Sequence, residues 1–554
     1  MQHLFTSSHR KRLLIVVIAF FTLLTIITVK LVSIMTMQAD DYGYRARAVQ
    51  ERERSIKAKR GSIYDRNGVV LAGNQAVCSI SVIYNQIEDP ETVIRVLSEK
   101  LELPEEDVRR RVEKRSVREK IKSNVDKELA DEIRAMNLAG VMIDEDYKRY
   151  YPYSTLASHV LGFTGSDNQG IVGLEVYYDD LLMGENGSIN TVTNARGIEV
   201  ENMAERRVEG TAGQNLVTSI DINIQQYITQ KALEVLEKKQ AKRVCIIVMN
   251  PQNGEIYALA DVPEYNLNEP FTLNYETDET VTQDMWNQMW RNYCISDTYE
   301  PGSPSKIFTV ATALEEGIIS QNDTFFCDGS QEVAGVQIKC DAWRRGGHGV
   351  LTLEETLMQS CNDAMMQIVA KSGASLFSKY QKMFGFGAKT GIDLPGEADT
   401  KNLIYDAQNL RPVELATNSF GQGYNCTMIQ MAAAYCSVIN GGSYYEPHVV
   451  RQILDEQGSV VTKIEPKLAR ETVSESTSTF IKHALFRTVN EGTGKAAAVA
   501  GYDIAGKTGT AEKIPRRQGN YLLSFCGFAP ADDPQVLVYV TIDEPHVEDQ
   551  AHSS

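Results

Sequence analysis

The stretch Tyr299-Glu300-Pro301-Gly302-Ser303-Pro304-Ser305-Lys306 delivers a serine from a turn to the start of an apolar segment. Pro301-Gly302 is a turn signal, and the apolar segment stops at Gly317, as helices often do at a glycine. On such a helix Ser303 and Lys306 share one face. A lysine in a dry pocket can be neutral enough to take the proton of a serine hydroxyl, which makes that hydroxyl a nucleophile. The stretch predicts this catalytic pair or, more simply, a helix-capping serine followed by an exposed lysine.

Two later motifs decide between these interpretations. Ser360-Cys361-Asn362 follows an apolar run, and Lys507-Thr508-Gly509-Thr510 occurs much nearer the end of the chain. Ser-x-x-Lys, Ser-Asp-Asn and Lys-Thr-Gly, in this order, are a signature of β-lactamases and penicillin-binding proteins. Each motif alone is also an ordinary polar helix, loop or strand end. Because all three occur in order at domain-scale separations, we favour the catalytic interpretation.

The length and composition describe a globular protein of several domains. The chain of 554 residues exceeds one ordinary domain, so two or three domains are expected. Hydrophobic residues make up 43% and charged residues 23% of the chain, which is typical of globular proteins. The net charge of −17 comes without any basic stripe, so no nucleic-acid partner is expected.

The nine cysteines and eight histidines show no short metal-binding motif. His-x-x-x-His and Cys-x-x-Cys spacings do not occur, so the sequence predicts no metal site. Cys327 and Cys340 bracket a short glycine-containing segment. They either close a hairpin as a disulfide or stay free and buried, and both alternatives are kept. Cys361 is expected to pack inside the middle motif, because Ser303 already supplies the nucleophile.

Residues 13–37 are expected to form a transmembrane anchor. They are apolar over a length that can cross a bilayer, with one interruption at Lys30. Arg10-Lys11-Arg12 precedes them, which places residues 1–12 in the cytoplasm and the rest of the chain outside the cell membrane. A cleaved signal peptide is the alternative. We favour a retained single-pass anchor, because the apolar run is long and no Ala-x-Ala site follows it.

Residues 38–210 are expected to form a pedestal between the anchor and the catalytic domain. The segment Arg60-Gly61-Ser62-Ile63-Tyr64-Asp65-Arg66-Asn67-Gly68 contains an Asn-Gly hairpin signal. Residues 89–137 are rich in charged side chains and carry apolar residues at helical spacing, which predicts a small helical lobe. Strands and turns follow around Gly173-Leu174-Glu175, without a catalytic cluster.

Residues 211–554 are expected to form an α+β catalytic domain. A strand leads into an amphipathic helix at 222–237, and the next two strands pair across a turn at 251–254. This order indicates a central antiparallel sheet flanked by helices. The strands are predicted at 215–221, 245–250, 255–260, 522–529 and 535–543.

Over nearly its whole length the chain resembles the class B penicillin-binding proteins, which are membrane-anchored D,D-transpeptidases of peptidoglycan. The resemblance rests on the anchor, the catalytic motifs, the Arg60–Gly68 motif, Gly173-Leu174-Glu175 and Ser419-Phe420-Gly421-Gln422-Gly423. It implies an elongated dimerisation-type pedestal followed by a transpeptidase domain. It also implies peptidoglycan stem peptides as substrates, β-lactams as acylating inhibitors, and no cofactor. The implied partners are a membrane-embedded glycan polymerase and division proteins, and a homodimer is left open.

The resemblance further implies roles for Ser303 and Lys306 of the first motif and for Ser360 and Asn362 of the middle motif. Ser303 attacks the carbonyl of the penultimate D-Ala of a stem peptide, and Lys306 takes the serine proton. Ser360 relays protons between Lys306 and the leaving amine. Asn362 hydrogen-bonds Lys306 or the substrate amide. The backbone N–H groups of Ser303 and Thr510 form the oxyanion hole.

The third motif is expected to hold the substrate. Lys507 lies against Ser360 and helps to anchor the substrate carboxylate, with the hydroxyls of Thr508 and Thr510 nearby. Gly509 is expected because a side chain there would block a substrate peptide laid alongside an edge strand.

Two features depart from the family pattern. Pro304-Ser305 stands inside the first motif where a small residue and then an apolar one are usual, although the spacing to Lys306 is intact. The family continues beyond the strand at 535–543 into a last helix, whereas this sequence ends at Ser554. We therefore expect a transpeptidase domain without its last helix and with a less stable sheet.

Three functions are weighed. The favoured one is a transpeptidase of septal or sporulation wall synthesis rather than elongation. The second is a β-lactam sensor or β-lactamase, which would need a signalling membrane domain or a deacylating base, and neither is evident. The third is a non-catalytic scaffold that partners a glycan polymerase; the short C-terminus favours it and the intact catalytic motifs oppose it.

Overall fold

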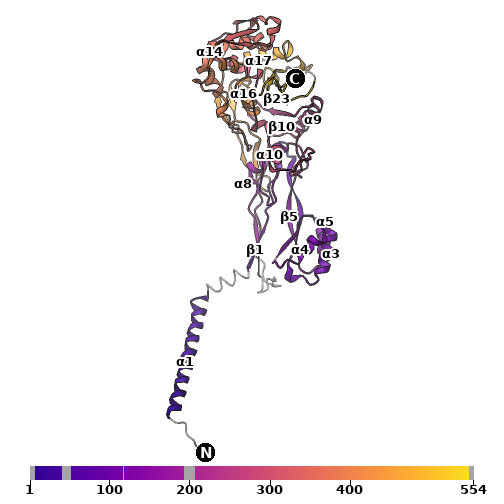
Figure 1. Cartoon of the computed structure of the whole chain (residues 1–554), viewed down its shortest axis with the longest axis vertical. Coiled ribbons are helices and arrows are strands. Elements are labelled where there is room, and N and C mark those ends of the chain that lie inside the picture. Colours follow the sequence, from indigo (N-terminus) through magenta and orange to yellow (C-terminus); the bar gives the residue numbers. More distant parts are fainter. Residues whose placement is uncertain (1–6, 40–50, 117, 193–205, 548–554) are drawn as a thin grey trace, which may run out of the picture. The chain divides into compact units, whose positions relative to one another are not determined.

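The computed structural model describes residues 7–39, 51–116, 118–192 and 206–547 (Figure 1). The chain divides into two compact units. The first comprises Met1–Ala58, Ala76–Tyr147 and Glu185–Thr211, and the second comprises Lys59–Gln75, Lys148–Gly184 and Ala212–Ser554. The Arg60–Gly68 and Gly173-Leu174-Glu175 motifs therefore lie in the second unit, together with the residues expected to form the catalytic domain.

Helix α1, Ser7–Thr36, contains the segment expected to cross a membrane (Figure 1). Its portion Arg10–Thr36 is 27 residues long, and it is the one helix in the described part of the chain that is long and apolar enough to span a bilayer. The hydroxyls of Thr22, Thr25 and Thr28 each donate to the carbonyl four residues earlier, at 2.8 Å. These bonds satisfy the polar atoms of the helix without water.

The first unit contains a small sheet and the helical lobe expected between residues 89 and 137. Strands β1 (Glu51–Ile56), β6 (Gly187–Val192) and β7 (Arg206–Val208) form an antiparallel sheet in the order β1-β6-β7. The lobe packs helices α3 (Pro90–Leu101), α4 (Glu105–Val112) and α5 (Lys127–Ala135) around one apolar core.

Strand β4, Glu119–Asp126, lies within this lobe and was not expected. Its buried apolar residues, Ile121 and Val125, are four positions apart, which is a helical spacing. Residues four apart also point to the same face of a strand, so this spacing does not distinguish the two structures. The strand pairs with β3 (Val70–Val82), and the register shifts between Cys78 and Ile80 and again between Ile80 and Ser81. Such bulges change which side chains face the core. The other elements that start in this part of the chain are η1 (Tyr84–Gln86) and β5 (Val141–Tyr150).

The second unit is built on a five-stranded antiparallel sheet in the order β10-β9-β23-β22-β21. The strands expected at 245–250, 255–260, 522–529 and 535–543 are all present, and the α+β fold with a central antiparallel sheet is confirmed. The edge strand β21 carries the third motif. The strands are β9 (Arg243–Met249), β10 (Ile256–Val262), β21 (Ala505–Glu512), β22 (Tyr521–Ala529) and β23 (Val536–Asp543).

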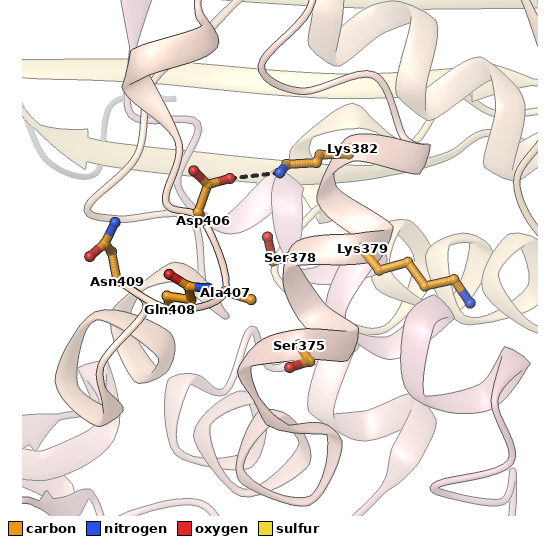
Figure 2. Close-up of a pocket in the computed structure, with 8 residues that line it drawn as sticks. All are labelled: Ser375, Ser378, Lys379, Lys382, Asp406, Ala407, Gln408 and Asn409. Atoms are coloured by element: carbon orange, nitrogen blue, oxygen red, sulfur yellow. Dashed lines mark hydrogen bonds and ion pairs between the residues drawn. The ribbon is translucent and has the colours of Figure 1, made fainter.

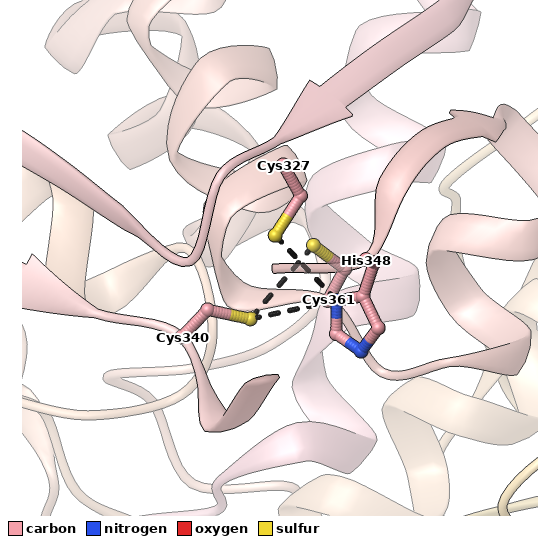
Figure 3. Close-up of side chains that lie close together, drawn as sticks. All are labelled: Cys327, Cys340, His348 and Cys361. Carbon is pink, nitrogen blue, oxygen red and sulfur yellow. Dashed lines mark hydrogen bonds between the residues drawn. The ribbon is translucent and has the colours of Figure 1, made fainter. Parts of the chain in front are cut away.

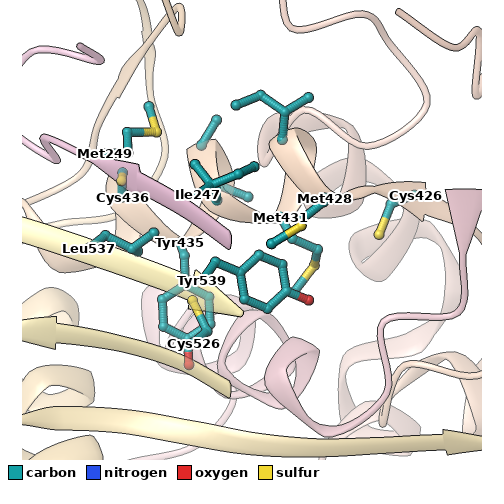
Figure 4. Close-up of a cluster of buried hydrophobic side chains, with 14 of the residues drawn as sticks. Ile247, Met249, Cys426, Met428, Met431, Tyr435, Cys436, Cys526, Leu537 and Tyr539 are labelled. Carbon is teal, nitrogen blue, oxygen red and sulfur yellow. The ribbon is translucent and has the colours of Figure 1, made fainter. Parts of the chain in front are cut away.

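Helices cover both faces of this sheet. On one face, α9 (Ile222–Lys239) packs Ile228 and Ala232 against Val244, Ile246 and Val248 of β9. The alternate residues of β9 point to the other face, as strand geometry requires. There they meet α16 (Met428–Ile439), every residue of which is buried. Figure 4 shows this second layer, in which Ile247 and Met249 lie with Met431, Tyr435, Leu537 and Tyr539.

Further helices and short strands complete the second unit. The helices are α6 (Ser158–Leu161), α7 (Gly173–Tyr177), α8 (Asp179–Leu182), α10 (Gln283–Trp290), α11 (Tyr293–Ser296), α12 (Lys306–Glu315), α13 (Leu353–Met358), α14 (Asn362–Met383), α15 (Pro412–Asn418) and α17 (Glu475–Asn490), with 3-10 turns η2 (Ser303–Ser305), η3 (Asp341–Arg345), η4 (Lys401–Leu403) and η5 (Lys495–Ala497). The strands are β2 (Ile63–Tyr64), β8 (Asn215–Thr218), β11 (Thr298–Tyr299), β12 (Thr324–Cys327), β13 (Ser330–Val333), β14 (Val336–Lys339), β15 (Gly349–Thr352), β16 (Cys426–Thr427), β17 (Ser443–Tyr445), β18 (Val450–Leu454), β19 (Val460–Lys463) and β20 (Leu468–Glu471).

The last described strand, β23, lies at the centre of the sheet between β9 and β22. On the face that α9 covers, the β23 residues Val536, Val538 and Val540 are only partly buried. The expectation that a last helix is missing concerns the segment after β23, and residues 548–554 of that segment lie outside the described residues.

A buried ion cluster anchors the Arg60–Gly68 motif inside the second unit. Arg60 Nε donates to Glu175 Oε2 at 2.6 Å, and Arg149 Nε donates to Glu175 Oε1 at 2.6 Å. The Tyr151 hydroxyl also donates to Glu175, at 3.1 Å, and Arg60 pairs with Asp179 at 2.7 Å. The side chains of Arg60 and Glu175 are completely buried. The Glu175 carboxylate thus bridges two guanidinium groups that come from distant parts of the sequence, and Asp179 supplies a second negative charge to the cluster.

Glu175→Gln should destabilise the protein by about 3–5 kcal/mol, because it removes the carboxylate that two buried guanidinium groups share, although Arg60 keeps its pair with Asp179. Urea unfolding of the full-length chain, followed by circular dichroism, measures this change. Glu234→Gln is the matched control, since Glu234 pairs with Lys231 on the exposed surface of α9 and should change stability by less than about 1 kcal/mol. Equal stability of the two variants would contradict the prediction.

Candidate active site

The first motif lies where a turn enters η2 and α12. Gly302 has a φ of 63°, which favours glycine, and its N–H donates to the Gly421 carbonyl at 2.9 Å. A Cβ on Gly421 would lie 2.1 Å from the Gly302 carbonyl oxygen. This close approach of two backbone segments holds Ser303, which is half-buried, at the start of α12. It also explains a glycine in the Ser419–Gly423 motif.

The middle motif lies in the tight connection between α13 and α14. Ser360 adopts a left-handed backbone conformation, with a φ of 53°, which is unfavourable for a residue that has a side chain. Its N–H donates to the Leu357 carbonyl at 3.1 Å. Cys361 caps α14, since its Sγ accepts from the Ala364 N–H at 3.4 Å. Asn362 is the first residue of α14 and is half-buried.

A chain of hydrogen bonds joins these two motifs. Lys306 Nζ donates to Ser360 Oγ at 3.0 Å and also to the Ser360 carbonyl oxygen. Ser360 Oγ donates to Ser303 Oγ at 3.0 Å. The hydroxyl of Ser360 therefore lies between the amine and the hydroxyl of Ser303, where it can pass a proton from one to the other.

Burial determines the protonation of the two motif lysines. Lys306 and Lys507 are both completely buried. Burial lowers the pKa of Lys306 to about 8, although the nearby Asp341 carboxylate opposes this shift. Burial, and secondly the charge of Lys306, hold the pKa of Lys507 well below its usual value. A substantial fraction of Lys306 is therefore neutral near physiological pH, and only the neutral amine can accept a proton.

The third motif lies on the edge strand β21. Lys507 Nζ donates to the Thr508 carbonyl at 3.2 Å, and along the strand Thr508 is half-buried, Gly509 buried and Thr510 exposed. A Cβ on Gly509 would lie 2.6 Å from Pro304 Cδ and 2.4 Å from Ser524 Oγ. Gly509 was expected because a side chain would block a substrate peptide along the strand edge, and this reason is wrong. A side chain at position 509 would point into the protein, against the first motif.

The structure brings some of the expected residues into contact and leaves others apart. Ser303, Lys306 and Ser360 are joined by hydrogen bonds, and Gly509 packs on Pro304. Within the described residues, no hydrogen bond links Lys507 to Ser360, and none links Asn362 to Lys306. Both contacts, and the substrate contacts of Thr508 and Thr510, stay predictions.

Gly509→Ala should slow acylation by a penicillin about 10²-fold, because the added methyl group displaces β21 from the first motif and shifts the reacting groups. Gly73→Ala is a suitable control, since a Cβ at Gly73 would meet only the side chain of Val70, at 3.3 Å. Stopped-flow measurements with a fluorescent penicillin give both rates. An unchanged rate for Gly509→Ala would show that the tight β21 contact does not position the site.

The pocket in Figure 2 is separate from these motifs. It lies between the C-terminal part of α14 and residues 406–409, and the ion pair between Lys382 Nζ and Asp406 Oδ1, at 2.7 Å, closes one side of it. Both of these side chains are more than half exposed. None of the motif residues lines this pocket, so it does not belong to the candidate active site.

Comparison with known proteins gives the same assignment along the chain. Residues 244–554 match the family model of the penicillin-binding protein transpeptidase domain, and residues 55–218 match that of the penicillin-binding protein dimerisation domain. Stage V sporulation protein D of Bacillus subtilis is 37% identical over 544 residues, which cover 97% of this chain and 82% of that protein. The probable peptidoglycan D,D-transpeptidase PenA of Neisseria meningitidis is 29% identical over 89% of this chain and 81% of its own length.

Solved structures agree in fold. Penicillin Binding Protein 2X from Streptococcus thermophilus superposes with a TM-score of 0.74 and 23% identity, over 90% of this chain and 78% of its own. The antiparallel sheet and the Ser-x-x-Lys site define a serine acyltransferase of the penicillin-binding type. The chain belongs to the class B penicillin-binding proteins, the serine-type D,D-transpeptidases of peptidoglycan, as its motifs predicted. Its substrates are peptidoglycan stem peptides, and it binds β-lactams.

One group of residues beside the site was not connected by the sequence analysis. Cys327, Cys340 and Cys361 come together with His348 next to the middle motif. All nine cysteines are free and buried, so of the two alternatives for Cys327 and Cys340 the structure has free thiols. The sequence feature that could have indicated this group is that Cys327, Cys340 and His348 lie between the first and middle motifs and Cys361 lies within the middle one. The spacings between these residues are longer than those of the short metal motifs that were sought.

Proposed function

We propose that Ser303 is the nucleophile of this transpeptidase and that Lys306 is its base. The observation that carries this proposal is the hydrogen-bonded series Lys306 Nζ, Ser360 Oγ and Ser303 Oγ, with both links at 3.0 Å. As Ser303 Oγ attacks the carbonyl carbon of the penultimate D-Ala, its proton moves to Ser360 Oγ while the Ser360 proton moves to neutral Lys306. Ser360 thus ends the step protonated, and Lys306 carries the positive charge.

The second half of the proposed reaction returns that proton. The tetrahedral intermediate collapses when the bond to the terminal D-Ala breaks, and Lys306 gives its proton back through Ser360 to the leaving amine. An amine from a neighbouring stem peptide then attacks the acyl-enzyme on Ser303 and forms the cross-link. We assign the oxyanion hole to the backbone N–H groups of Ser303 and Thr510. The 3.5 Å separation between a Cβ built on Gly302 and the Thr510 carbonyl oxygen supports this pairing of segments.

Four further residues are assigned to substrate binding. Lys507 and the hydroxyls of Thr508 and Thr510 are proposed to hold the carboxylate of the stem peptide or the β-lactam, while Asn362 is proposed to bind the substrate amide. Support comes from their placement on β21, whose Gly509 packs on Pro304, and at the start of α14, two residues after Ser360. Arginine or lysine beside hydroxyl donors is a common way to bind a carboxylate.

We also propose a location and a cellular role. Helix α1 is proposed as a single-pass membrane anchor, with the catalytic unit outside the cytoplasm; its length and the preceding Arg10-Lys11-Arg12 support this orientation. The 37% identity to a protein named for stage V of sporulation supports a role in spore wall synthesis. A membrane-embedded glycan polymerase, division proteins and a second copy of the chain are the proposed partners.

Mass spectrometry after incubation with benzylpenicillin tests the assignment of the nucleophile. We expect one stable penicilloyl adduct per chain, on the peptide that carries Ser303. An adduct on any other peptide would overturn the assignment. Rapid loss of the adduct by hydrolysis would favour the β-lactamase alternative, and no adduct on a folded protein would favour the non-catalytic scaffold.

The rate of acylation should increase with pH up to about 8 and then level off. Lys306 acts in its neutral form, and burial lowers its pKa from the usual range to about 8, so protonation removes the base progressively below that pH. The rate should fall about tenfold per pH unit well below the pKa. Lys507, Asp341, Cys340 and Cys361 are the other titratable groups whose charges act on this amine. Circular dichroism at each pH controls for unfolding, and a flat profile between pH 6 and 8 would contradict Lys306 as the base.

A further inference from the structure

Cys327, Cys340, Cys361 and His348 form what we call the thiol–imidazole cluster, shown in Figure 3. Their ligand atoms all lie within 4.8 Å of one another. Cys327 Sγ and Cys340 Sγ lie 3.5 Å and 3.8 Å from His348 Nδ1. Cys340 Sγ lies 3.9 Å from Cys361 Sγ. The three cysteines are buried, and the His348 side chain is only 9% exposed.

The three shortest of these separations, 3.5, 3.8 and 3.9 Å, match those of a tetrahedral zinc site. With Zn–S bonds of about 2.3 Å and Zn–N bonds of about 2.0–2.1 Å, tetrahedral geometry separates two sulfurs by about 3.8 Å and a sulfur from a nitrogen by about 3.6 Å. Three thiolates and one imidazole are the soft and borderline donors that select zinc. We propose that the thiol–imidazole cluster binds one Zn²⁺ ion as a closed, four-ligand structural site.

The surroundings of the cluster fit this assignment. His348 turns Nδ1 toward the three sulfurs, and its other ring nitrogen, Nε2, faces Asp341 Oδ1 at 4.0 Å. A carboxylate on the far side of the ring is the usual partner of a zinc-bound histidine. Gly347, with a φ of 91°, brings His348 over the end of β12. A Cβ there would lie 2.2 Å from the Cys327 carbonyl oxygen, so the loop can close on the cluster only with glycine at that position.

Two alternatives account for less of the geometry. Buried cysteines commonly pack as small apolar residues, but such packing does not require four donor atoms to converge or the ring nitrogen to face them. A disulfide between Cys340 and Cys361 would need a bond of about 2.05 Å, whereas the two sulfurs lie 3.9 Å apart.

The position of the cluster couples it to catalysis, a consequence that rests on the proposed function. Cys361 directly follows Ser360, whose hydroxyl bonds both Ser303 and Lys306. Ser360 also carries the unfavourable left-handed backbone conformation. A metal bond to the next residue would hold that conformation and keep the Ser360 hydroxyl in line. Cys361 is thus a positioning residue, and the metal ion itself takes no part in the acyl transfer.

Metal binding is tested on the full-length chain, purified in detergent under reducing conditions and freed of metal with a chelator. Zinc is added back, and bound metal is measured by elemental analysis after gel filtration. Cobalt(II) is used in parallel, since tetrahedral thiolate coordination gives intense visible bands and a sulfur-to-cobalt charge-transfer band. We expect one equivalent of metal per chain and the tetrahedral spectrum. Cys327→Ser and His348→Gln should each lower the affinity at least tenfold. Cys436→Ala, which alters a buried cysteine of α16 outside the cluster, should leave it unchanged.

Acylation by benzylpenicillin is measured on the same samples as a separate readout. Zinc-loaded wild-type protein should be acylated at least tenfold faster than metal-free wild-type protein. The Cys436→Ala variant should show the same difference between its zinc-loaded and metal-free forms. Failure of wild-type protein to bind zinc or cobalt would overturn the site without bearing on the Ser303 assignment. Metal binding by Cys327→Ser and His348→Gln with unchanged affinity would also overturn it. A Cys340–Cys361 disulfide in the wild-type protein would overturn it too, if the protein bound no metal after that disulfide was reduced. If zinc binds but acylation is equal with and without it, the site stands and its coupling to Ser360 is wrong.

Discussion

Ser303→Ala should form no covalent adduct with benzylpenicillin, and its acylation rate should fall by at least about 10³-fold, below detection. The methyl group that replaces the hydroxyl cannot attack a carbonyl, and no other described hydroxyl shares the bond to Ser360. Because a catalytic nucleophile and its base act as one unit, the loss should be nearly complete. Quantitative mass spectrometry of the intact protein measures it.

Ser305→Ala is the matched control for this experiment. Ser305 lies on the same turn, but its hydroxyl is buried and donates to the Gly302 carbonyl at 2.7 Å, so the variant should keep acylation within about tenfold of the wild type. If Ser303→Ala still formed a stable adduct, the nucleophile would have to be sought elsewhere. If Ser305→Ala were equally inactive, the loss would reflect damage to the turn.

Lys306→Met should slow acylation by about 10²–10⁴-fold, the range for loss of a positioned general base. Methionine fills the same space without a charge. The folded state should be no less stable, since the substitution removes the need to bury an amine that can be charged. The residual rate should also lose its dependence on pH near 8, the pKa to which burial brings Lys306.

Stopped-flow acylation and urea unfolding are therefore measured together on this variant. Lys379→Met serves as the control, because Lys379 is more than half exposed on α14 and pairs with Glu316 on the surface; it should change neither quantity. A large loss of stability in Lys306→Met would mean that the slow acylation reports misfolding. Retained acylation would exclude Lys306 as the base.

Much of this architecture could be predicted from local patterns. The strands of the sheet were predictable because buried apolar runs alternate with turn signals, and the Ser-x-x-Lys pair was predictable because its spacing places both side chains on one helical face. Strand β4 was missed because its two buried apolar residues, Ile121 and Val125, are four positions apart, a spacing that fits a helix as well as a strand. The direction of a Cβ at Gly509 could not be foreseen, since it depends on how β21 packs against Pro304, far away in the sequence.

The thiol–imidazole cluster was missed for a similar reason. Its four residues come from the end of β12, two loop positions and the cap of α14, and no short spacing rule describes that arrangement. The expectation that Lys507 lies against Ser360 came from resemblance alone. In the structure Lys507 Nζ donates to the carbonyl of its neighbour Thr508, a contact that depends on side-chain conformations that a motif does not specify.

The placement of β23 determines when during synthesis this enzyme can become reactive. Strands β9 and β10 are made early, yet β22 and β21 join them only through β23, which is synthesised after the other four strands of this sheet. Before β23 is in place, β21, which carries Lys507, cannot join β9 and β10 in the sheet. Gly509 then cannot pack against Pro304. A chain that has not yet formed β23 should therefore react with neither β-lactam nor stem peptide. The pairing of residues so distant in sequence also makes folding slow and leaves the newly made chain exposed to aggregation or proteolysis before its activity appears.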